Sequence, residues 1–293
     1  MPDKKKLLVI SGGGIFGYVP AYLLSAAEPN LNAKGRIDYL SGTSVGGIIS
    51  LMLADARQPV EVLEMFHECA DEIFYKYDFL NLLNPFRPIY GDKHFNQTLM
   101  RVFGVERRLK ELGVPVIIPT VNFSRSRPKV YETLLSQDAD QQEYIWEVAR
   151  KTASAPVYFP PFAGFIDGGL FANTPVVEAA FAINSKVGVR FEDMDVFIIG
   201  TGCEPDPYIS PDELRGWSKL KWIKPLLTTL TKSNEARSMY LAERMGFNSL
   251  RYFNPAILDS SWRMDDVSLM PMLRSRLQRH FTAFETMLED FLA

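Results

Sequence analysis

The chain has 293 residues, of which 47% are hydrophobic and 23% charged, a balance typical of a protein that buries a core. Its net charge is -3, and the lack of a basic excess excludes a nucleic-acid polymer as the expected partner. The two cysteines, Cys69 and Cys203, are too few for a disulfide framework and lack the spacing of a zinc site. We therefore expect free thiols, and neither a metal nor a cofactor.

The beginning of the chain predicts a cytoplasmic protein. After Lys4–Lys6 the apolar run covers only Leu7–Ile10, which is too short for a signal peptide or a bilayer span. No later stretch reaches the length of a span without charges, so any membrane contact is expected to be peripheral. The chain shows no repeat, low-complexity tract or break in composition, which predicts a single domain over residues 1–293.

The first sixty residues alternate short apolar strands with helices. We expect strands at Leu7–Ser11 and Ile37–Ser41, each followed by glycines and then by a helix, at Val19–Ala27 and Ile48–Ala56. A strand–helix unit repeated in this way favours an α/β fold with a parallel sheet covered by helices.

The remaining elements are expected at regular intervals along the chain. Further strands are predicted at 114–122 and 129–134, as an antiparallel pair, and at 165–166, 196–200 and 250–254. Further helices are predicted at 60–72, 93–103, 144–154, 176–183 and about 268–291, with Pro175 as the first residue of the fourth.

The segment Gly42-Thr43-Ser44-Val45-Gly46 is a G-x-S-x-G sequence between a strand and a helix. Glycines on both sides permit the strained turn that presents a serine hydroxyl at the end of a sheet. The helix that follows directs its N-terminal N–H groups toward the same point. Ser44 is therefore the candidate nucleophile.

Three consecutive glycines, Gly12, Gly13 and Gly14, follow the first strand. Their backbone N–H groups can form an oxyanion hole, because no Cβ blocks the approach of a substrate. The same run satisfies G-x-G-x-x-G, so a dinucleotide-binding protein is an alternative, with Asp38 as the acidic residue for the ribose. Asp38 stands near the start of the second strand, however, rather than near its end. A Walker A loop is excluded because no Gly-Lys-Ser/Thr follows.

Asp167 ends a short strand and begins Asp167-Gly168-Gly169. Taken alone, Asp-Gly is typical of a turn. Together with the triple glycine and the G-x-S-x-G sequence, it resembles the patatin-like phospholipases. Similar runs at Thr152–Pro156, Asn173–Pro175 and Gly200–Gly202 extend the resemblance over about residues 5–255.

This resemblance implies a three-layer α/β/α sandwich with a mainly parallel central sheet and a phospholipase A-type lipid acyl hydrolase. It implies a Ser–Asp dyad that acts through an acyl-serine, with Ser44 as nucleophile, Asp167 as base and the backbone of Gly12–Gly14 as oxyanion hole. It implies a membrane phospholipid or another lipid ester as substrate. Some bacterial members are switched on by cyclic nucleotides, so a small-molecule activator of this class is included among the partners.

The glycine loop departs from the family pattern at two positions. The loop usually begins with Asp and carries Arg before its last glycine, whereas this chain has Ser11 and Phe16. We expect activity because the backbone donors remain, although the cation near the oxyanion hole is missing.

Two other classes of function remain open from the sequence. His280 follows Ser44 and Asp167 in the chain order of an α/β-hydrolase triad. Against this esterase, only one strand–helix unit precedes the serine, and His280 stands among Arg274, Arg276 and Arg279. The other class is a non-catalytic protein that binds a lipid or a dinucleotide, against which the intact serine and aspartate argue.

Two further segments have both a functional and a structural interpretation. The aromatic stretch Phe74–Phe86 suits a lid or a wall for an acyl chain, and equally a small core under a long connection. The stretch Trp217–Lys224 alternates aromatic and cationic residues, which suits a lipid–water boundary or a helix that packs its tryptophans inward.

Overall fold

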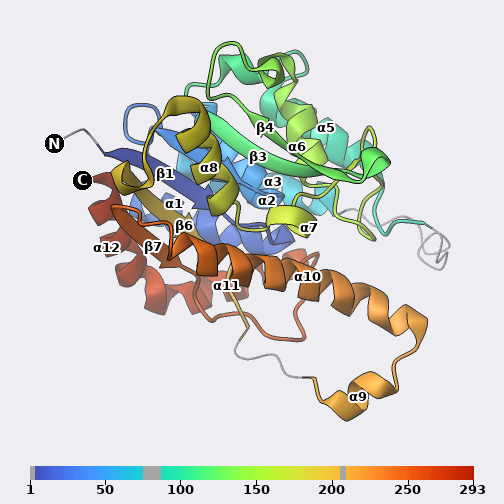
Figure 1. Ribbon diagram of the computed structural model, residues 1–293. Helices are drawn as coiled ribbons and strands as arrows, with labels where there is room; N and C mark the ends of the chain where they lie inside the picture. Colours follow the sequence, from blue (N-terminus) through green and yellow to red (C-terminus); the bar gives the residue numbers. More distant parts are fainter. Residues whose placement is uncertain (1–3, 75–86, 205–208) are drawn as a thin grey trace.

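A single sheet crosses the centre of the protein (Figure 1). The computed structural model describes residues 4–74, 87–204 and 209–293. The strands follow the order β4-β3-β2-β1-β6-β7, and β5 also pairs with β3. Neighbouring strands are parallel, except that β4 and β5 run antiparallel to β3. The strands are β1 Lys5–Ile10, β2 Tyr39–Gly42, β3 Val116–Asn122, β4 Arg127–Glu132, β5 Phe165–Ile166, β6 Met194–Ile199 and β7 Ser249–Phe253.

Helices cover both faces of this sheet. Those whose apolar residues join the larger core are α1 Tyr18–Ala27, α2 Val45–Ala54, α3 Pro59–Ile73, α5 Asp92–Phe103, α6 Ile145–Thr152, α11 Met270–Leu277 and α12 Phe281–Leu292. Those that join the smaller core are α8 Val176–Val187 and α10 Lys219–Ala242. Two short helices, α7 Gly169–Ala172 and α9 Pro211–Arg215, complete the set that the structure describes. The expected three-layer α/β/α sandwich with a mainly parallel sheet is confirmed.

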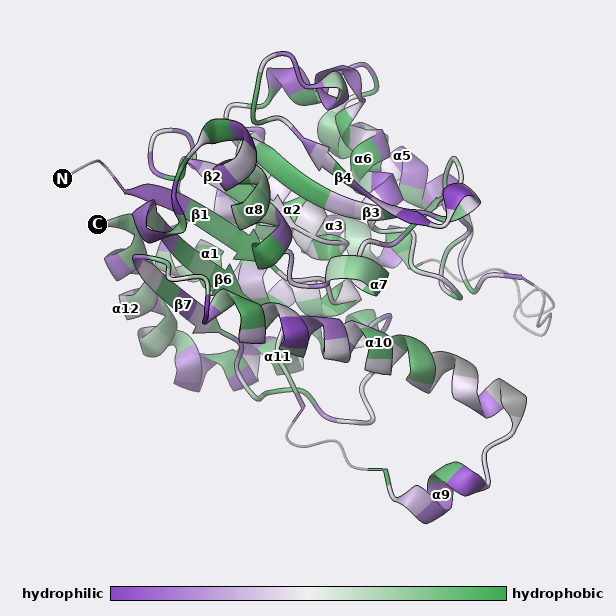
Figure 2. Ribbon diagram, viewed as in Figure 1, coloured by the Kyte–Doolittle hydropathy of each residue, from purple (hydrophilic) through white to green (hydrophobic). Residues whose placement is uncertain are grey.

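The buried part of the central strand β1, Leu7–Ile10, is apolar at every position. Leu8 and Ile10 belong to the larger core, whereas Leu7 and Val9 belong to the smaller one. Side chains alternate between the faces of a strand, so a strand covered on both faces needs apolar residues at every position. In Figure 2, β1 is purple at its first residues and green along the rest of its length.

The structure corrects the sequence prediction at two helices. Pro175 is the residue before α8 rather than its first residue, and α8 begins at Val176. The single C-terminal helix expected over about 268–291 is interrupted by a 3₁₀ turn at Gln278–His280, which separates α11 from α12. A helix is one of two interpretations of Trp217–Lys224 from the sequence, and α10 extends from Lys219 to Ala242, well beyond that stretch.

The pairing around β3 brings distant parts of the chain together. β4 occupies one edge of β3, while β2 pairs with Val116 and Ile117 on the other edge. β5 pairs with Val121 and Asn122 further along that second edge. The chain that leaves β5 therefore emerges beside the carboxyl end of β2.

Candidate active site

Ser44 occupies a strained turn between β2 and α2. It is the residue before the first turn of α2, and its φ of 55° and ψ of -126° lie where non-glycine residues rarely occur. The helix approaches the sheet so closely that a Cβ on Gly46 would lie 2.5 Å from the carbonyl oxygen of Ser11. The glycines of G-x-S-x-G therefore permit the close packing that holds the serine in this conformation.

Asp167 lies beside Ser44, immediately after β5. Its backbone N–H donates to the carbonyl oxygen of Ser154 at 3.0 Å, and its Oδ1 accepts the N–H of Gly169 at 2.7 Å. Burial raises the pKa of Asp167 to about 6, and hydrogen bonds from the Ser44 side chain and the Gly169 backbone act in the opposite direction. The structure thus brings the predicted nucleophile and the predicted base together.

Thr152 connects both residues to the sheet. Its hydroxyl accepts the N–H of Ser44 at 3.1 Å and donates to the carbonyl oxygen of Pro119 in β3 at 2.7 Å. Its own carbonyl oxygen accepts the N–H of Gly168 at 3.1 Å. In the sequence, Thr152–Pro156 is only part of the family resemblance. In the structure, Thr152 and Ser154 of this run hold Ser44 and Asp167 in place by hydrogen bonds to their backbones and to that of Gly168.

The three predicted oxyanion donors differ in their availability. The N–H of Gly12 donates to the carbonyl oxygen of Asn173 at 3.1 Å, so it is not free to bind a substrate. Within the described part of the chain, the N–H groups of Gly13 and Gly14 have no such acceptor. Gly14 has a φ of 59° and lines the pocket that contains Ser44. The expectation for Gly12 is corrected accordingly, and Gly13 and Gly14 remain as candidates.

A polar network fixes the glycine loop from behind. The carbonyl oxygen of Gly12 accepts hydrogen bonds from the Thr201 hydroxyl at 3.0 Å and from the Asn173 amide at 3.4 Å. Asn173 also donates to Glu235 of α10 at 3.4 Å, and the Tyr252 hydroxyl donates to the same carboxylate at 2.7 Å. These contacts give a structural role to the runs Asn173–Pro175 and Gly200–Gly202.

The two unusual residues of the loop are both buried. The Ser11 hydroxyl lies 2.7 Å from the Thr174 hydroxyl, in hydrogen-bonding contact. Phe16 packs into the larger core. Neither residue brings a charge to the loop, so the replacement of the usual Asp and Arg leaves its interior neutral.

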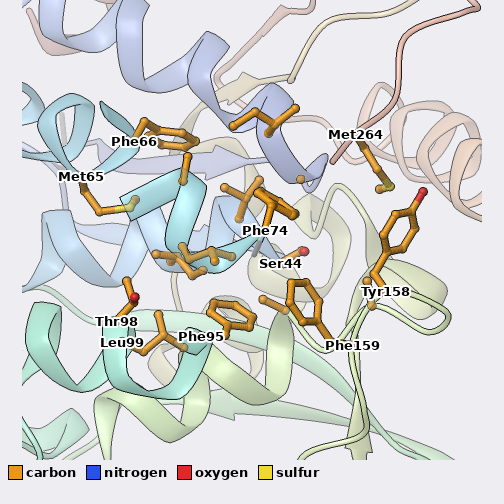
Figure 3. A pocket seen from close by; sticks show the side chains of 18 of the residues that line it. Ser44, Met65, Phe66, Phe74, Phe95, Thr98, Leu99, Tyr158, Phe159 and Met264 are labelled. Atoms are coloured by element: carbon orange, nitrogen blue, oxygen red, sulfur yellow. The ribbon is translucent and has the colours of Figure 1, made fainter. Parts of the chain in front are cut away.

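An apolar pocket opens at Ser44 (Figure 3). It encloses about 770 Å³ of atom-free space, part of it open to solvent. Ser44 and Gly14 belong to its lining. The rest of the wall is mostly aromatic and aliphatic side chains from α3 and the residue after it, from α5, from the segment after α6 and from the segment between β7 and α11, among them Met65, Phe66, Phe74, Phe95, Leu99, Tyr158, Phe159 and Met264. Thr98 is one of the few polar side chains in this wall. The pocket suits a long hydrocarbon chain whose reacting end lies at Ser44.

Comparison with known proteins agrees with this arrangement. The sequence profile described as Patatin-like phospholipase matches residues 8–180. The chain belongs to the patatin-like phospholipase family. It is 30% identical to a cGAMP-activated phospholipase of Escherichia coli, over 82% of this chain and 77% of that protein. It is 28% identical to a cGAMP-activated phospholipase of Vibrio cholerae, over 74% of this chain and 70% of the relative. It is 26% identical to Patatin-like protein 4 of Arabidopsis thaliana, over 74% and 64% of the two chains.

Arg150 of this patatin-like chain is a buried cation that the sequence analysis did not single out. Its guanidinium lies 4.9 Å from the ring centre of Phe95 and 5.6 Å from that of Phe159, both in the pocket wall. It donates to Asn96 at 2.9 Å and to the Ser154 hydroxyl at 2.5 Å. Burial lowers its pKa to about 10. Arg150 therefore links the pocket wall to the residue that holds the Asp167 backbone.

The residues of the alternative functions lie elsewhere. The Asp38 carboxylate accepts hydrogen bonds from the Lys5 side chain and the Lys6 backbone, next to the amino end of β1 and opposite the Ser44 end of the sheet. His280 stands in the 3₁₀ turn between α11 and α12, where its ring accepts a hydrogen bond from Arg279. None of the three histidines is among the residues that line the pocket.

Phe74 lines the pocket, but the rest of the predicted aromatic lid, residues 75–86, lies outside the described part of the chain. Residues 4–74, 87–204 and 209–293 contain no cluster of His, Cys, Asp and Glu that could hold a metal ion. Within the same ranges, no helix combines the length and apolarity needed to cross a bilayer.

Proposed function

We propose that the protein is a phospholipase A-type lipid acyl hydrolase in which Ser44 is the nucleophile and Asp167 the base. The observation that carries this proposal is the pair itself. A serine at a strained elbow hydrogen-bonds a buried aspartate whose pKa is raised to about 6, and the serine lines an apolar pocket. Membership of the patatin-like phospholipase family supports the same substrate class.

In the proposed reaction, the Ser44 Oγ attacks the carbonyl carbon of a fatty-acyl ester and its proton moves to the Asp167 carboxylate. With a pKa of about 6, Asp167 is mostly ionised at neutral pH and is a stronger base than an ordinary aspartate. The negative oxygen of the tetrahedral intermediate accepts hydrogen bonds from the N–H groups of Gly13 and Gly14.

Collapse of this intermediate breaks the ester bond and leaves an acyl group on Ser44. The leaving alcohol takes the proton from Asp167. Water then attacks the acyl-serine with Asp167 again as base, which releases the fatty acid and regenerates the enzyme. Each proton is returned, so the cycle needs no cofactor.

The proposal is tested by incubating the protein with vesicles of mixed phospholipids and identifying the released products by mass spectrometry. We expect free fatty acids and lysophospholipids from the wild type and none from Ser44→Ala, because that change deletes the attacking oxygen. Equal release by both proteins would contradict the assignment. Binding of lipid without any release would favour a non-catalytic lipid-binding protein.

We also propose that a cyclic nucleotide activates the enzyme. This part rests on the E. coli and V. cholerae relatives, both named cGAMP-activated phospholipases. Addition of cGAMP to the vesicle assay is expected to increase fatty-acid release, and the increase is expected to be absent with Ser44→Ala. Identical rates with and without cGAMP would remove cGAMP as activator and leave the hydrolase assignment in place.

A further inference from the structure

The first half of α10 extends beyond the body of the molecule, together with α9 (Figure 1). Among the α10 residues whose side chains are described, the first buried one is Ser238. Ahead of it, Trp222, Leu226 and Leu230 are 43%, 49% and 45% exposed. Side chains four residues apart lie on the same side of a helix, so the three form one exposed row. We call Trp222, Leu226 and Leu230 the apolar stripe.

The surroundings of the apolar stripe carry a positive charge. The sequence from 211 to 232 contains five Lys or Arg and two Asp or Glu, whereas the whole chain has a net charge of -3. Arg215 and Lys221 pair with Asp212 and Glu213 at 3.5 and 3.4 Å, but all four side chains are more than half exposed. Lys232 also pairs, with Glu204 outside this range, at 3.3 Å. Exposed pairs of this kind contribute little, so the net positive charge of the sequence from 211 to 232 still favours an anionic surface.

Aromatic side chains accompany these cations. The rings of Trp217 and Trp222 lie 5.1 Å apart, and the Lys221 ammonium lies 4.9 Å from the ring centre of Trp217. Tryptophan is enriched at the lipid–water boundary, where its ring is partly buried and its N–H stays near water. Lysine beside it keeps its charge in the headgroup layer while its stem lies along apolar surface.

The same helix contacts the segment that follows Asp167. The Asn234 amide of α10 donates to the carbonyl oxygen of Leu170 in α7 at 2.9 Å. In Figure 1, α10 passes α7 and continues outward beyond it. One helix, α10, therefore carries the apolar stripe and also contacts the segment that follows Asp167 in the candidate active site.

We propose that the apolar stripe of α10 docks on an anionic lipid surface, an inference that deepens the proposed lipid hydrolase and rests on it. The apolar side chains enter the outer hydrocarbon layer while the neighbouring cations contact the headgroups. Charge favours this occupant over a second copy of the chain, because two cationic segments repel each other, whereas anionic lipids attract them.

The test measures vesicle binding in a Ser44→Ala background, so that lipid breakdown does not alter the surface. The probes are vesicles of phosphatidylcholine with and without phosphatidylglycerol, followed by flotation. Leu226→Asp and the double variant Trp222→Asp with Leu226→Asp remove the stripe. Met272→Asp in α11 is the matched control, because Met272 is 48% exposed. Melting temperatures verify that every variant is folded.

The parent is expected to bind the phosphatidylglycerol vesicles more tightly, and increasingly so as salt is lowered. Leu226→Asp is expected to weaken this binding about tenfold or more, because one large apolar side chain removed from hydrocarbon has an effect of that size. Met272→Asp is expected to bind like the parent. Equal binding by the parent, Leu226→Asp and Met272→Asp would overturn the proposal.

Sedimentation of the same proteins without lipid tests whether the apolar stripe binds a second copy of the chain instead of a lipid surface. A parent dimer that Leu226→Asp converts to a monomer would assign the stripe to a second copy and overturn lipid docking. The vesicle-binding result does not depend on whether the protein hydrolyses lipid. If the wild type releases no fatty acid but vesicle binding follows the expected pattern, the proposed hydrolysis fails while the docking surface stands.

Discussion

Thr152 holds Ser44 in place through one hydrogen bond, in which the Ser44 N–H donates to the Thr152 hydroxyl at 3.1 Å. The same hydroxyl donates to Pro119, and the Thr152 carbonyl oxygen accepts the N–H of Gly168, the residue after Asp167. One buried threonine thus fixes the distance between the elbow and the aspartate, although it carries no chemistry itself.

Replacement of Thr152 by valine keeps its shape and removes its hydroxyl. Two buried partners then lose a hydrogen bond, and we expect the free energy of unfolding to fall by about 1–3 kcal/mol. Ester hydrolysis is expected to fall by about tenfold or more, because positioning errors are costly in catalysis. Thr152→Ser restores the hydroxyl and is expected to recover most of the rate. A Thr152→Val enzyme with a wild-type rate would show that this contact does not position the pair.

The strain at Ser44 predicts a difference between two inactive variants. Ser44→Ala and Ser44→Gly both remove the nucleophile, but only glycine adopts the φ of 55° without a steric cost. Relief of such strain is worth about 1–3 kcal/mol, so Ser44→Gly is expected to melt at a higher temperature than Ser44→Ala. Calorimetry checks this order, and the reverse order would mean that the elbow stores no strain.

The buried carboxyl of Asp167 predicts how stability depends on pH. Its folded-state pKa of about 6 lies above the ordinary aspartate value of 3.8, so the folded protein holds this proton more tightly than the unfolded chain. The stability that the protonated carboxyl contributes is complete below pH 3.8 and is lost as the pH rises through about 6. Ionised Asp167 therefore destabilises the fold at neutral pH, by on the order of 2–3 kcal/mol.

Asp167→Asn tests this linkage, since an amide oxygen can still accept the Gly169 N–H. The variant is expected to melt above the wild type at pH 7 and to lose that advantage as the pH falls toward 4. Thermal melts across this range measure the difference. A constant difference at every pH would show that Asp167 does not titrate with a raised pKa.

Much of this fold can be read from the sequence because its strands are buried on both faces. The continuous apolar runs of β1 and β6 identify these strands without ambiguity, and glycine positions identify the turns after β1 and β2. The break between α11 and α12 could not be read in the same way, because Gln278–His280 has ordinary helical composition.

The candidate active site also contains residues that the sequence reveals and residues that it does not. Ser44 is recognisable because its glycines are local in sequence, whereas Asp167 gains its role only together with the other two motifs, through the family resemblance. The hydrogen bond of the Gly12 N–H to Asn173, 161 residues away along the chain, depends on tertiary structure, and no local pattern announces it. Arg150 was missed for a related reason, since a cation in a predicted helix is usually assigned to the solvent face.

Gly14 offers a test of the proposed oxyanion hole. A Cβ at this position would overlap the carbonyl oxygen of Met264, and the φ of 59° is unfavourable for alanine. Gly14→Ala is therefore expected to displace the N–H donor and to lower hydrolysis by about 10²-fold or more, the effect typical of losing one such donor. Its melting temperature is also expected to fall.

The exposed Gly188 supplies the control, since a Cβ there meets no neighbour although φ is 81°. Gly188→Ala imposes a similar backbone penalty far from the pocket and is expected to keep the wild-type rate at a lowered melting temperature. Parallel losses of rate in both glycine variants would attribute the effect to general destabilisation rather than to the oxyanion hole.

The central claim is that Asp167 alone activates Ser44, and acylation of the protein measures it most directly. After brief exposure to a p-nitrophenyl fatty-acyl ester, intact-mass spectrometry is expected to show one acyl group on the wild type, located on Ser44 by peptide mapping. Asp167→Asn is expected to show none, while His67→Ala, His94→Ala and His280→Ala each acylate at a rate near the wild type. An acyl group on another residue, undiminished acylation of Asp167→Asn, or a loss of about 10³-fold in His280→Ala, the scale of a triad histidine, would contradict the account.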